Sequence, residues 1–310
     1  MMTAKPAVAP GLIVVVGSLN MDLITRVSQV PEGGVTCYGH GFSTAPGGKG
    51  ANQAVACARL GGRVAMVGRV GDDDMGKTLL SGLQREGIDT THVLQTPGTA
   101  SGVATILVED SGQNRIILAP GANALLSAQD IDRAEALFSQ AALIVVQLET
   151  PLETVEHVLR RAQAAKVPVL LNPAPAVPLP AAMLSNVDYL VPNESEAALL
   201  TGQGVSSVED AKRAAQQLYT QGARTVLVTI GEKGVLVHHE QASHAFAAHT
   251  VRAVDTTAAG DTFIGGLCVG LVQGWHLEKA VALAQAASAL CVTRAGAQPS
   301  IPYRRELPDF

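Results

Sequence analysis

The sequence predicts an α/β fold with a doubly wound, mostly parallel sheet that helices cover on both faces. The first observation is a rhythm, because from about residue 125 onward short apolar runs alternate with amphipathic segments. The second is that runs such as 142–149 and 225–230 are almost continuously apolar, as strands buried on both faces of a parallel sheet are. The third is the run "GLIVVVGSL" at 11–19, which we interpret as a buried first strand.

The other elements follow in order along the chain. The stretch 45–62 is predicted to be a glycine-rich turn and then an amphipathic helix that starts near Ala51. Beyond it we expect helices at 126–140, 151–165, 194–202 and 208–222, and strands at 142–149, 167–172, 187–193 and 225–230. Near the end of the chain, 244–254 is predicted to form a strand, and 263–274 belongs to a helix whose first turn begins near Gly260.

Two segments, 22–44 and 99–123, do not follow this rhythm. They contain short alternating strands with Gly and Asp-Ser-Gly turns, which is typical of antiparallel pairing. We therefore predict a single domain over residues 11–310 with a small antiparallel β lid, whose strands come from about 22–45 and 98–119. A lid that closes over a ligand excludes water from reactive phosphates.

The composition excludes several classes of protein. The net charge of −5 is spread without any block of like charges, which argues against a nucleic-acid or membrane surface. The four cysteines form no CxxC pair, which argues against a zinc site or a disulfide framework and favours a reducing cytoplasm. The apolar run at 11–19 is too short to span a membrane. An anionic ligand must therefore be held by local amides and single cations.

The stretch "VDTTAAGDTFIGG" at 254–266 carries two aspartates around a turn of small residues. Ligands of open α/β sheets bind outside the carboxyl ends of the strands, and the first turn of a helix there offers unpaired N–H groups to an anion. Asp261 falls in that first turn, and Asp255 precedes it by six residues. The alternative is an ordinary helix N-cap.

The stretch "GGKGAN" surrounds Lys49 with glycines just before a helix. Glycines allow the backbone to approach a ligand closely, although the spacing matches neither a Walker A motif nor the dinucleotide GxGxxG motif. Asn52 adds a donor and an acceptor suited to a hydroxyl-bearing ligand. The alternative is a flexible turn with a solvated lysine.

Carboxylates and amides follow two other strands. Asn20 and Asp22 share one face if the chain is extended there, and a carboxylate on that face can accept hydrogen bonds from two neighbouring sugar hydroxyls. A turn-forming Asn-x-Asp is the alternative. Glu149 ends the strand 142–149, either as a ligand contact or as a neighbour of the next helix start.

Two further loops suit a nucleotide. Asn193 and Glu196 lie three residues apart, which fits either an outer grip on Mg²⁺ or a capping box. The turn at 231–234 has two glycines whose exposed amides suit phosphates, although as a bare β-turn it would mean nothing.

These motifs resemble those of one enzyme family. The pair "GGKGANQA" and "DTTAAGDTF" is similar to the two signatures of the phosphofructokinase-B, or ribokinase-like, sugar kinases. Further segments resemble the family in order and spacing over about residues 11–305: "GSLNMD", "QLETPLETV", "LNPAPA", "PNESEAALLTG", "RTVLVTIGEKG" and "VTRAGAQPSIP". The resemblance implies a cytoplasmic enzyme that phosphorylates D-ribose at its 5-hydroxyl with ATP, giving D-ribose 5-phosphate and ADP.

The resemblance also implies a role for each matching residue. Asp261 would be the general base, and the amides of Ala258, Ala259 and Gly260 would form an anion hole. The implied sugar-binding residues are Asn20, Asp22, Gly48, Lys49, Gly50, Ala51, Asn52 and Glu149, together with Asp261. The implied nucleotide-binding residues are Asn193, Thr229, Ile230, Gly231, Glu232, Lys233, Gly234, Gly260 and Gln285.

Two metal sites are implied as well. Glu196 would lie near the shell of Mg²⁺. Asp255 would bind an activating monovalent cation, usually K⁺, which separates its role from that of Asp261. The remaining ligands implied for that cation are the carbonyls of Thr257, Cys291, Arg294 and Gly296, with Ser300.

The chain departs from the family pattern in three places. "EGGVT" follows Pro31 where relatives often have Gly-Glu-Thr. The family implies a homodimer that forms through the lid strands, so we expect this difference to alter lid packing or the contacts between subunits. Ile264 stands where many relatives have Asn, for which we expect a packing change, and Gln285 occupies the usual adenine-contact position. The alternatives are a kinase for a related pentose or nucleoside, such as 2-deoxyribose, and a non-catalytic sugar or nucleotide sensor. The intact Asp261 and Gly260 favour the enzyme.

Overall fold

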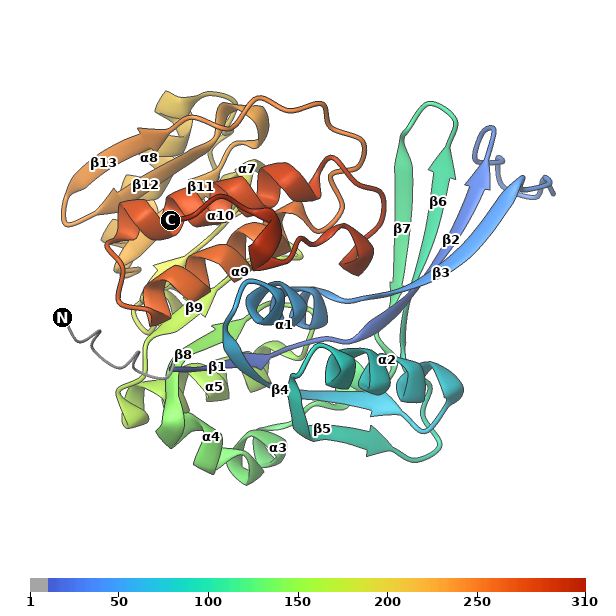
Figure 1. Ribbon diagram of the computed structural model, residues 1–310, viewed down its shortest axis with the longest axis horizontal. Coiled ribbons are helices and arrows are strands. Elements are labelled where there is room, and N and C mark those ends of the chain that lie inside the picture. Colours follow the sequence, from blue (N-terminus) through green and yellow to red (C-terminus); the bar gives the residue numbers. More distant parts are fainter. Residues whose placement is uncertain (1–10) are drawn as a thin grey trace, which may run out of the picture.

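The computed structural model describes residues 11–310, over which a nine-stranded main sheet forms with the order β13-β12-β11-β10-β9-β8-β1-β4-β5 (Figure 1). Every neighbouring pair from β11 to β5 is parallel, and β12 and β13 add an antiparallel edge. The strands are β1 Leu12–Val16, β4 Arg63–Gly71, β5 Asp89–Thr96, β8 Ala141–Val146, β9 Val169–Leu171, β10 Tyr189–Leu190, β11 Thr225–Thr229, β12 Val235–His239 and β13 Ala242–Phe246.

Helices cover both faces of this sheet, each over its own hydrophobic core. One core packs α1, α2, α9 and α10 against the sheet, and the other packs α3 to α8 against the opposite face. The predicted doubly wound fold is therefore confirmed. The α-helices are α1 Lys49–Arg59, α2 Asp74–Arg85, α3 Ala128–Arg133, α4 Glu135–Gln140, α5 Leu152–Ala165, α6 Ala181–Leu184, α7 Glu194–Thr201, α8 Val208–Thr220, α9 Ala259–Val272 and α10 Leu277–Cys291. Short 3₁₀ helices lie at η1 Gly121–Leu125, η2 Gly231–Lys233, η3 Gln298–Ser300 and η4 Arg304–Glu306.

Two predicted elements differ from the structure. The helix expected at 126–140 is divided into α3 and α4 at Ala134, where two successive i to i−3 hydrogen bonds tighten the backbone. The strand expected at 244–254 ends at Phe246, because its partner β12 begins opposite, at Val235, and offers no further backbone groups. Across residues 11–310 we find no helix with both the length and the apolarity to span a membrane.

A second sheet of four strands stands away from the main body, at the right in Figure 1, in the order β3-β2-β6-β7. Its strands are β2 Asn20–Val27, β3 Gly41–Gly47, β6 Gly102–Glu109 and β7 Asn114–Ala119. Strands lie in both segments predicted for the lid, whose closing over a ligand stays a prediction. The expected antiparallel pairing holds for β2 with β3 and for β6 with β7, but β2 and β6 run parallel. Both follow strands of the parallel main sheet, β1 and β5, and therefore leave it in the same direction.

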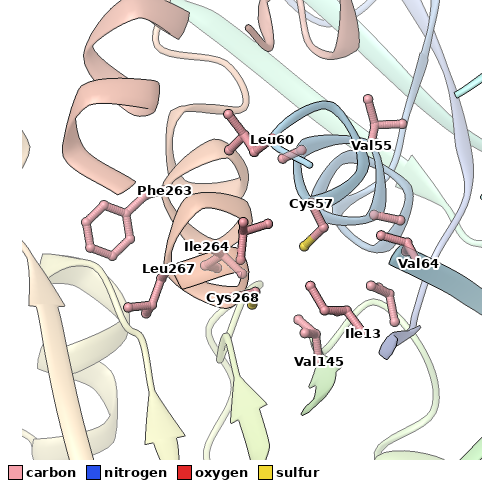
Figure 2. Close-up of a cluster of buried hydrophobic side chains, with 14 of the residues drawn as sticks. Ile13, Val55, Cys57, Leu60, Val64, Val145, Phe263, Ile264, Leu267 and Cys268 are labelled. Atoms are coloured by element: carbon pink, nitrogen blue, oxygen red, sulfur yellow. The ribbon is translucent and has the colours of Figure 1, made fainter. Parts of the chain in front are cut away.

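Close packing of α1 against α9 brings the two signature motifs together. Figure 2 shows α9 beside α1, with Ile264 and Cys268 of α9 toward Cys57 of α1, while Phe263 lies on the side of α9 away from α1. Gly265 lies at the contact, where an added Cβ would be only 2.4 Å from the Ala56 Cβ. A larger residue at this position would push apart the two helices that carry the candidate catalytic groups. Ile264 is buried in this core, as expected for a packing change.

Candidate active site

Two cavities at the carboxyl ends of the strands are lined by part of the predicted site residues. The first has a volume of ≈ 180 Å³, and its lining includes Lys49, Asn172, Asn193, Glu196, Thr229, Gly260 and Asp261. The second has a volume of ≈ 290 Å³, and its lining includes Asn20, Glu149 and the apolar side chains of Leu118, Leu148 and Pro151. The predicted nucleotide and sugar residues therefore lie on two sides of one region, where the lid sheet meets the main sheet.

Asp261 is buried in the first turn of α9, with each carboxylate oxygen held by one amide. Asn52 Nδ2 donates to Oδ2 at 3.0 Å, and Gln53 Nε2 donates to Oδ1 at 2.9 Å. Both donors lie on α1, so the α1–α9 contact fixes the carboxylate. Asp261 therefore keeps free lone pairs on a carboxylate that cannot rotate without breaking a hydrogen bond.

The turn before Asp261 presents free backbone amides. Ala258 has a left-handed backbone with φ 60°, a conformation that costs a non-glycine residue about 1–3 kcal/mol and is often found at functional sites. The Ala259 N–H donates to the Thr256 carbonyl at 3.2 Å, so it is used inside the turn. Within residues 11–310, the N–H groups of Ala258, Gly260 and Asp261 have no protein acceptor. The predicted anion hole thus keeps two of its three amides and gains that of Asp261.

Asp22 is a buried carboxylate without a protein donor among residues 11–310. It lies on β2 beside Gly47, at whose position an added Cβ would come within 2.4 Å of Oδ2. Burial raises the pKa of Asp22 to about 7, and the nearby Glu149 and Asp261 carboxylates add to the rise. A ligand that donates hydrogen bonds would stabilise this group.

Asn52 presents a second acceptor of the same kind, because its Oδ1 is buried without a partner in the described chain. Asn20 lies on β2 two residues before Asp22, so the chain is extended there, as the sugar-binding interpretation requires. The Asn20 side chain donates to Glu149 Oε2 at 3.3 Å and accepts from Asn123 Nδ2 at 2.8 Å. Two buried acceptors without protein donors in the described chain, both close to Asp261, suit a ligand rich in hydroxyl groups.

Glu149 anchors the glycine turn that precedes α1. Its Oε2 accepts from Ser18 Oγ at 2.5 Å and from the Lys49 backbone N–H at 3.1 Å. Gly50 packs against the backbone of Gly17, because a Cβ added to Gly50 would be only 2.8 Å from the Gly17 Cα. The glycines of this motif are therefore needed for close packing of backbone on backbone, which places Lys49 at the cavity and Asn52 beside Asp261.

The half-buried Lys49 ammonium is the cation of this carboxylate cluster. Burial, the largest single influence, lowers the pKa of Lys49, but Asp261, Glu149 and Glu196 together raise it above its ordinary value. The side chain therefore stays charged at neutral pH. It lines the same cavity as the free amides near Gly260, so a positive charge and amide donors converge there.

The predicted capping box at the start of α7 is confirmed. Asn193 Oδ1 accepts from the Glu196 N–H at 2.9 Å, and Glu196 Oε2 accepts from the Asn193 N–H at 2.9 Å. Burial raises the pKa of Glu196. Both residues also line the cavity, so an outer contact to a hydrated Mg²⁺ stays a prediction that the geometry allows.

Of the other predicted nucleotide residues, Thr229 lines the same cavity, whereas residues 230–234 and Gln285 do not. Thr229 forms an isolated bridge with Asn193 and is followed by η2, which comprises Gly231, Glu232 and Lys233. Gly231 and Gly234 have positive φ values of 47° and 100°, as the turn interpretation requires. Ile230 is buried. Gln285 Nε2 donates to the carbonyls of Phe246 and Ala247, so this side chain ties the end of β13 to α10.

Asp255 lies in a separate cluster next to the anion turn. Its Oδ1 accepts from the Thr257 N–H and hydroxyl at 2.8 and 2.6 Å, and its Oδ2 accepts from the Gly296 N–H at 2.9 Å. These bonds lower the pKa of Asp255 although burial opposes them. Cys291 and Ser300 lie together, with Sγ and Oγ 3.0 Å apart, while the Arg294 guanidinium pairs with Glu306. The predicted cation residues are thus brought together by two loops, 254–257 and 291–300.

Four buried amide side chains at the site were not among the predicted site residues: Gln53, Gln147, Asn123 and Asn172. The signal for the first two was present in the sequence. Gln53 interrupts the apolar face of α1, and Gln147 interrupts the apolar run 142–148. A polar residue at a position that the pattern predicts as core needs a buried partner, and here the partner is the candidate base or a residue next to it.

Known proteins share this arrangement over nearly the whole chain. The profile of the pfkB family carbohydrate kinases matches residues 11–304. The chain is 43% identical to a ribokinase of Haemophilus influenzae, covering 96% of this chain and 97% of that one. It is 42% identical to a deoxyribokinase of Salmonella typhi, with coverage of 96% and 98%.

The fold agrees with a solved structure. A ribokinase of Arabidopsis thaliana, complexed with ribose and ATP, superposes with a TM-score of 0.88 at 33% identity, over 96% of this chain and 97% of that one. Sequence and structure therefore lead to the same assignment. The chain belongs to the pfkB family of carbohydrate kinases and is a ribokinase-like sugar kinase.

Proposed function

We propose that the protein transfers the γ-phosphate of ATP to the 5-hydroxyl of D-ribose and releases D-ribose 5-phosphate and ADP, with residues 11–310 acting as one kinase unit. The observation that carries the proposal is the pair of buried, unpaired acceptors, Asp22 and Asn52 Oδ1, beside the doubly held Asp261. Sugar hydroxyls supply the donors that these acceptors lack. The similarity to a ribokinase complexed with ribose and ATP supports the same pairing of ligands.

The chemistry assigned to these residues is a direct phosphoryl transfer. The 5-oxygen of the sugar forms a bond to the γ-phosphorus while its proton passes to Asp261. The bond from the γ-phosphorus to the bridging oxygen breaks, and ADP leaves with its electron pair. The free amides of Ala258, Gly260 and Asp261, with the Lys49 ammonium, stabilise the charge on the transferring oxygens.

Two metal ions complete the proposal. Mg²⁺ would neutralise the phosphate charge, with Asn193 and Glu196 contacting its shell, and their carboxylate and amide oxygens fit that ion. K⁺ prefers hard oxygen donors, and these are supplied by the Asp255 carboxylate and by the carbonyls of the 254–257 and 291–300 loops. A K⁺ ion bound there would stabilise the conformation of the anion turn without contacting the substrate. This chain's own contribution is the hydrogen-bond pair of Asp255 to Thr257 and Gly296, which links the two loops.

We also propose a homodimer through the lid sheets. The outer strand β7 is exposed along its whole length, with Ile116 and Ile117 exposed by 55% and 65%, and Phe42 on β3 is exposed by 69%. Large apolar side chains on an open sheet are best covered by a second sheet of the same kind.

The proposal is tested by measuring ADP release with a panel of sugars. D-Ribose is expected to give the highest kcat/KM. The similarity to a deoxyribokinase makes 2-deoxyribose the second candidate substrate, and a higher kcat/KM with 2-deoxyribose would transfer the assignment to it. A protein that binds ribose but releases no ADP with any sugar would instead be a sensor.

Asp22→Asn is expected to weaken ribose binding by about 1.5–3 kcal/mol, the value of a hydrogen bond to a charged group. Because the pKa of Asp22 is about 7, wild-type ribose affinity should also fall as pH is lowered through 7, and the variant should lose this dependence. Isothermal titration with ribose between pH 5.5 and 8.5 checks both effects. Equal affinities for the two proteins at pH 8 would contradict the assignment.

The same substitution should stabilise the protein without sugar. A carboxyl whose pKa is raised on folding loses stabilisation as pH rises from its unfolded value of 3.8 to about 7. The Tm of Asp22→Asn should therefore exceed that of wild type more at pH 8 than at pH 5. If the Tm difference between the variant and wild type becomes smaller as pH rises, the ionised Asp22 carboxylate does not destabilise the folded protein.

Asp255→Ala is expected to remove most of the activation by potassium. In wild type, kcat should rise on adding K⁺ and much less on adding Na⁺, whose smaller radius suits a different cage. The measurement is kcat against salt at constant ionic strength, with Asp188→Asn as a control at a distant, partly buried carboxylate. Identical rates of wild type in the two salts would argue against the site.

A further inference from the structure

A chain of buried side-chain amides runs behind Asp261. It begins at Gln147, directly after β8, continues through Gln53 on α1, and ends at Asp261 and at Asn172, which follows β9. Gln53 is 0% exposed and Gln147 is 1% exposed, so neither side chain can exchange its partners for water. The chain joins three elements of the main domain to one carboxylate oxygen.

The contacts give Gln53 a single orientation. Its Nε2 donates to Asp261 Oδ1 at 2.9 Å and to Asn172 Oδ1 at 3.1 Å, and its Oε1 accepts from Gln147 Nε2 at 2.6 Å. Asn172 is oriented in turn, because its Nδ2 donates to the Val191 carbonyl at 3.0 Å. A reversed Gln53 would direct its oxygen at two other oxygens and its NH₂ at the NH₂ of Gln147. The acceptors on Asp261 and Asn172 and the donor on Gln147 therefore agree on which end of Gln53 faces Asp261.

The arrangement has a cost that packing alone does not explain. Gln147 Oε1 is buried without a partner in residues 11–310, and a buried amide oxygen without a donor destabilises the folded state. Gly17 leaves space for this oxygen, because a Cβ added to Gly17 would lie only 2.0 Å from Gln147 Oε1. An apolar side chain at position 147 would remove this unpaired oxygen but would leave Gln53 Oε1 without its donor.

We propose that Gln53 and Gln147 are positioning residues for the general base. Gln53 fixes Oδ1 of Asp261 while Asn52 fixes Oδ2, so that the carboxylate cannot rotate about its Cβ–Cγ bond and its free lone pairs stay directed at the cavity. Gln147 acts only through Gln53, by holding its amide with the donor end toward Asp261. The inference rests on the proposed function, in which Asp261 accepts the proton of the sugar hydroxyl.

Gln53→Met and Gln147→Met test the first consequence. Gln53→Met keeps the length of the side chain but removes the donor to Oδ1, and it should lower kcat by about 10²-fold, the loss expected when a reacting group is misplaced by about 1 Å. The KM values for sugar and ATP should stay close to wild type. Gln147→Met should lower kcat less, since Gln53 keeps its donor. Gln217→Met, which removes hydrogen bonds of the same kind on the distant α8, should keep wild-type kcat.

Double variants separate positioning from a general structural role. In an Asp261→Asn background, Gln53→Met should cause no further loss of the residual turnover, because a residue that acts through the base has no effect once the base is gone. Likewise, Gln147→Met should add nothing to Gln53→Met. A merely structural role would lower the turnover of each background by the same factor as in wild type, and that result would overturn the proposal.

The outcomes also separate this inference from the proposed function. If Asp261→Asn keeps wild-type turnover, the assignment of the base fails and the positioning proposal fails with it. If Asp261→Asn loses turnover while Gln53→Met keeps wild-type kcat, only the positioning proposal fails. Should Gln53→Met not fold, Gln53→Glu replaces it, because its carboxylate lacks the donor and should lower kcat at least as much at the same KM.

Discussion

The Asp261→Asn variant is expected to lose roughly 10²–10⁴-fold in kcat, the usual value of general-base catalysis. A sugar hydroxyl is a poor nucleophile at neutral pH, so a group must accept its proton as the bond to phosphorus forms. Asp261 lies where the free amides of the 258–261 turn and the Lys49 ammonium meet. Asparagine keeps the size and one acceptor oxygen but cannot accept the proton.

Ribose and ATP affinities should stay within several-fold of wild type, because the substitution removes no contact on which ground-state binding mainly depends. Steady-state kinetics and isothermal titration measure the two effects separately. Asp188→Asn is the matched control, since Asp188 is also a carboxylate held by two donors, from Val169 and Arg224, far from the cavity. If Asp261→Asn keeps more than a tenth of wild-type turnover, another group accepts the proton.

Lys49→Met is expected to produce the second large loss, about 10²–10³-fold in kcat, as when one donor to a developing charge is removed. The Lys49 ammonium is held among Asp261, Glu149 and Glu196, which raise its pKa and keep it charged. Without it, the transferring phosphoryl group would meet these carboxylates without a neutralising cation from the protein. The KM for ATP should rise as well, since the ground-state phosphates lose the same charge.

The control for this variant is Lys212→Met on α8, which should leave kcat unchanged. The measurement is kcat and KM for ATP at saturating ribose, with Tm to confirm folding. Loss of ribose affinity alone, at an unchanged kcat, would place Lys49 in the sugar subsite and not at the phosphate.

The main sheet was predictable from the sequence because its strands are buried on both faces. Runs such as 142–146 carry only apolar residues, and amphipathic helices separate them. Local patterns fail at Ala134. The helical periodicity of 126–140 continues through this residue, although the folded chain divides the helix there into α3 and α4. The parallel pairing of β2 with β6 depends on where two distant strands leave the main sheet, which no local pattern contains.

The candidate site was predictable as far as its residues follow strands or begin helices. Asp22, Lys49 and Asp261 lie where glycine turns and strand ends led us to expect them. The Ala259 N–H forms a hydrogen bond within its own turn, where Ala258 has a left-handed backbone. An alanine in the sequence does not indicate that conformation, so this bond could not be predicted. Gln53 was missed because a polar residue on a helix is ordinarily solvated, and its partners come from α9 and from the ends of β8 and β9, which lie far from it in the sequence.

The most direct test of the proposed function is the position of the new phosphate on the product. Wild-type protein, ribose and MgATP are incubated with K⁺, and the product is examined by phosphorus NMR with coupling to protons. The proposed function predicts one phosphosugar whose phosphorus couples to the two C5 protons, formed in equal amount to ADP and at least about 10²-fold more slowly with Asp261→Asn. ADP released without a phosphosugar, or a phosphate on any other sugar oxygen, would contradict it.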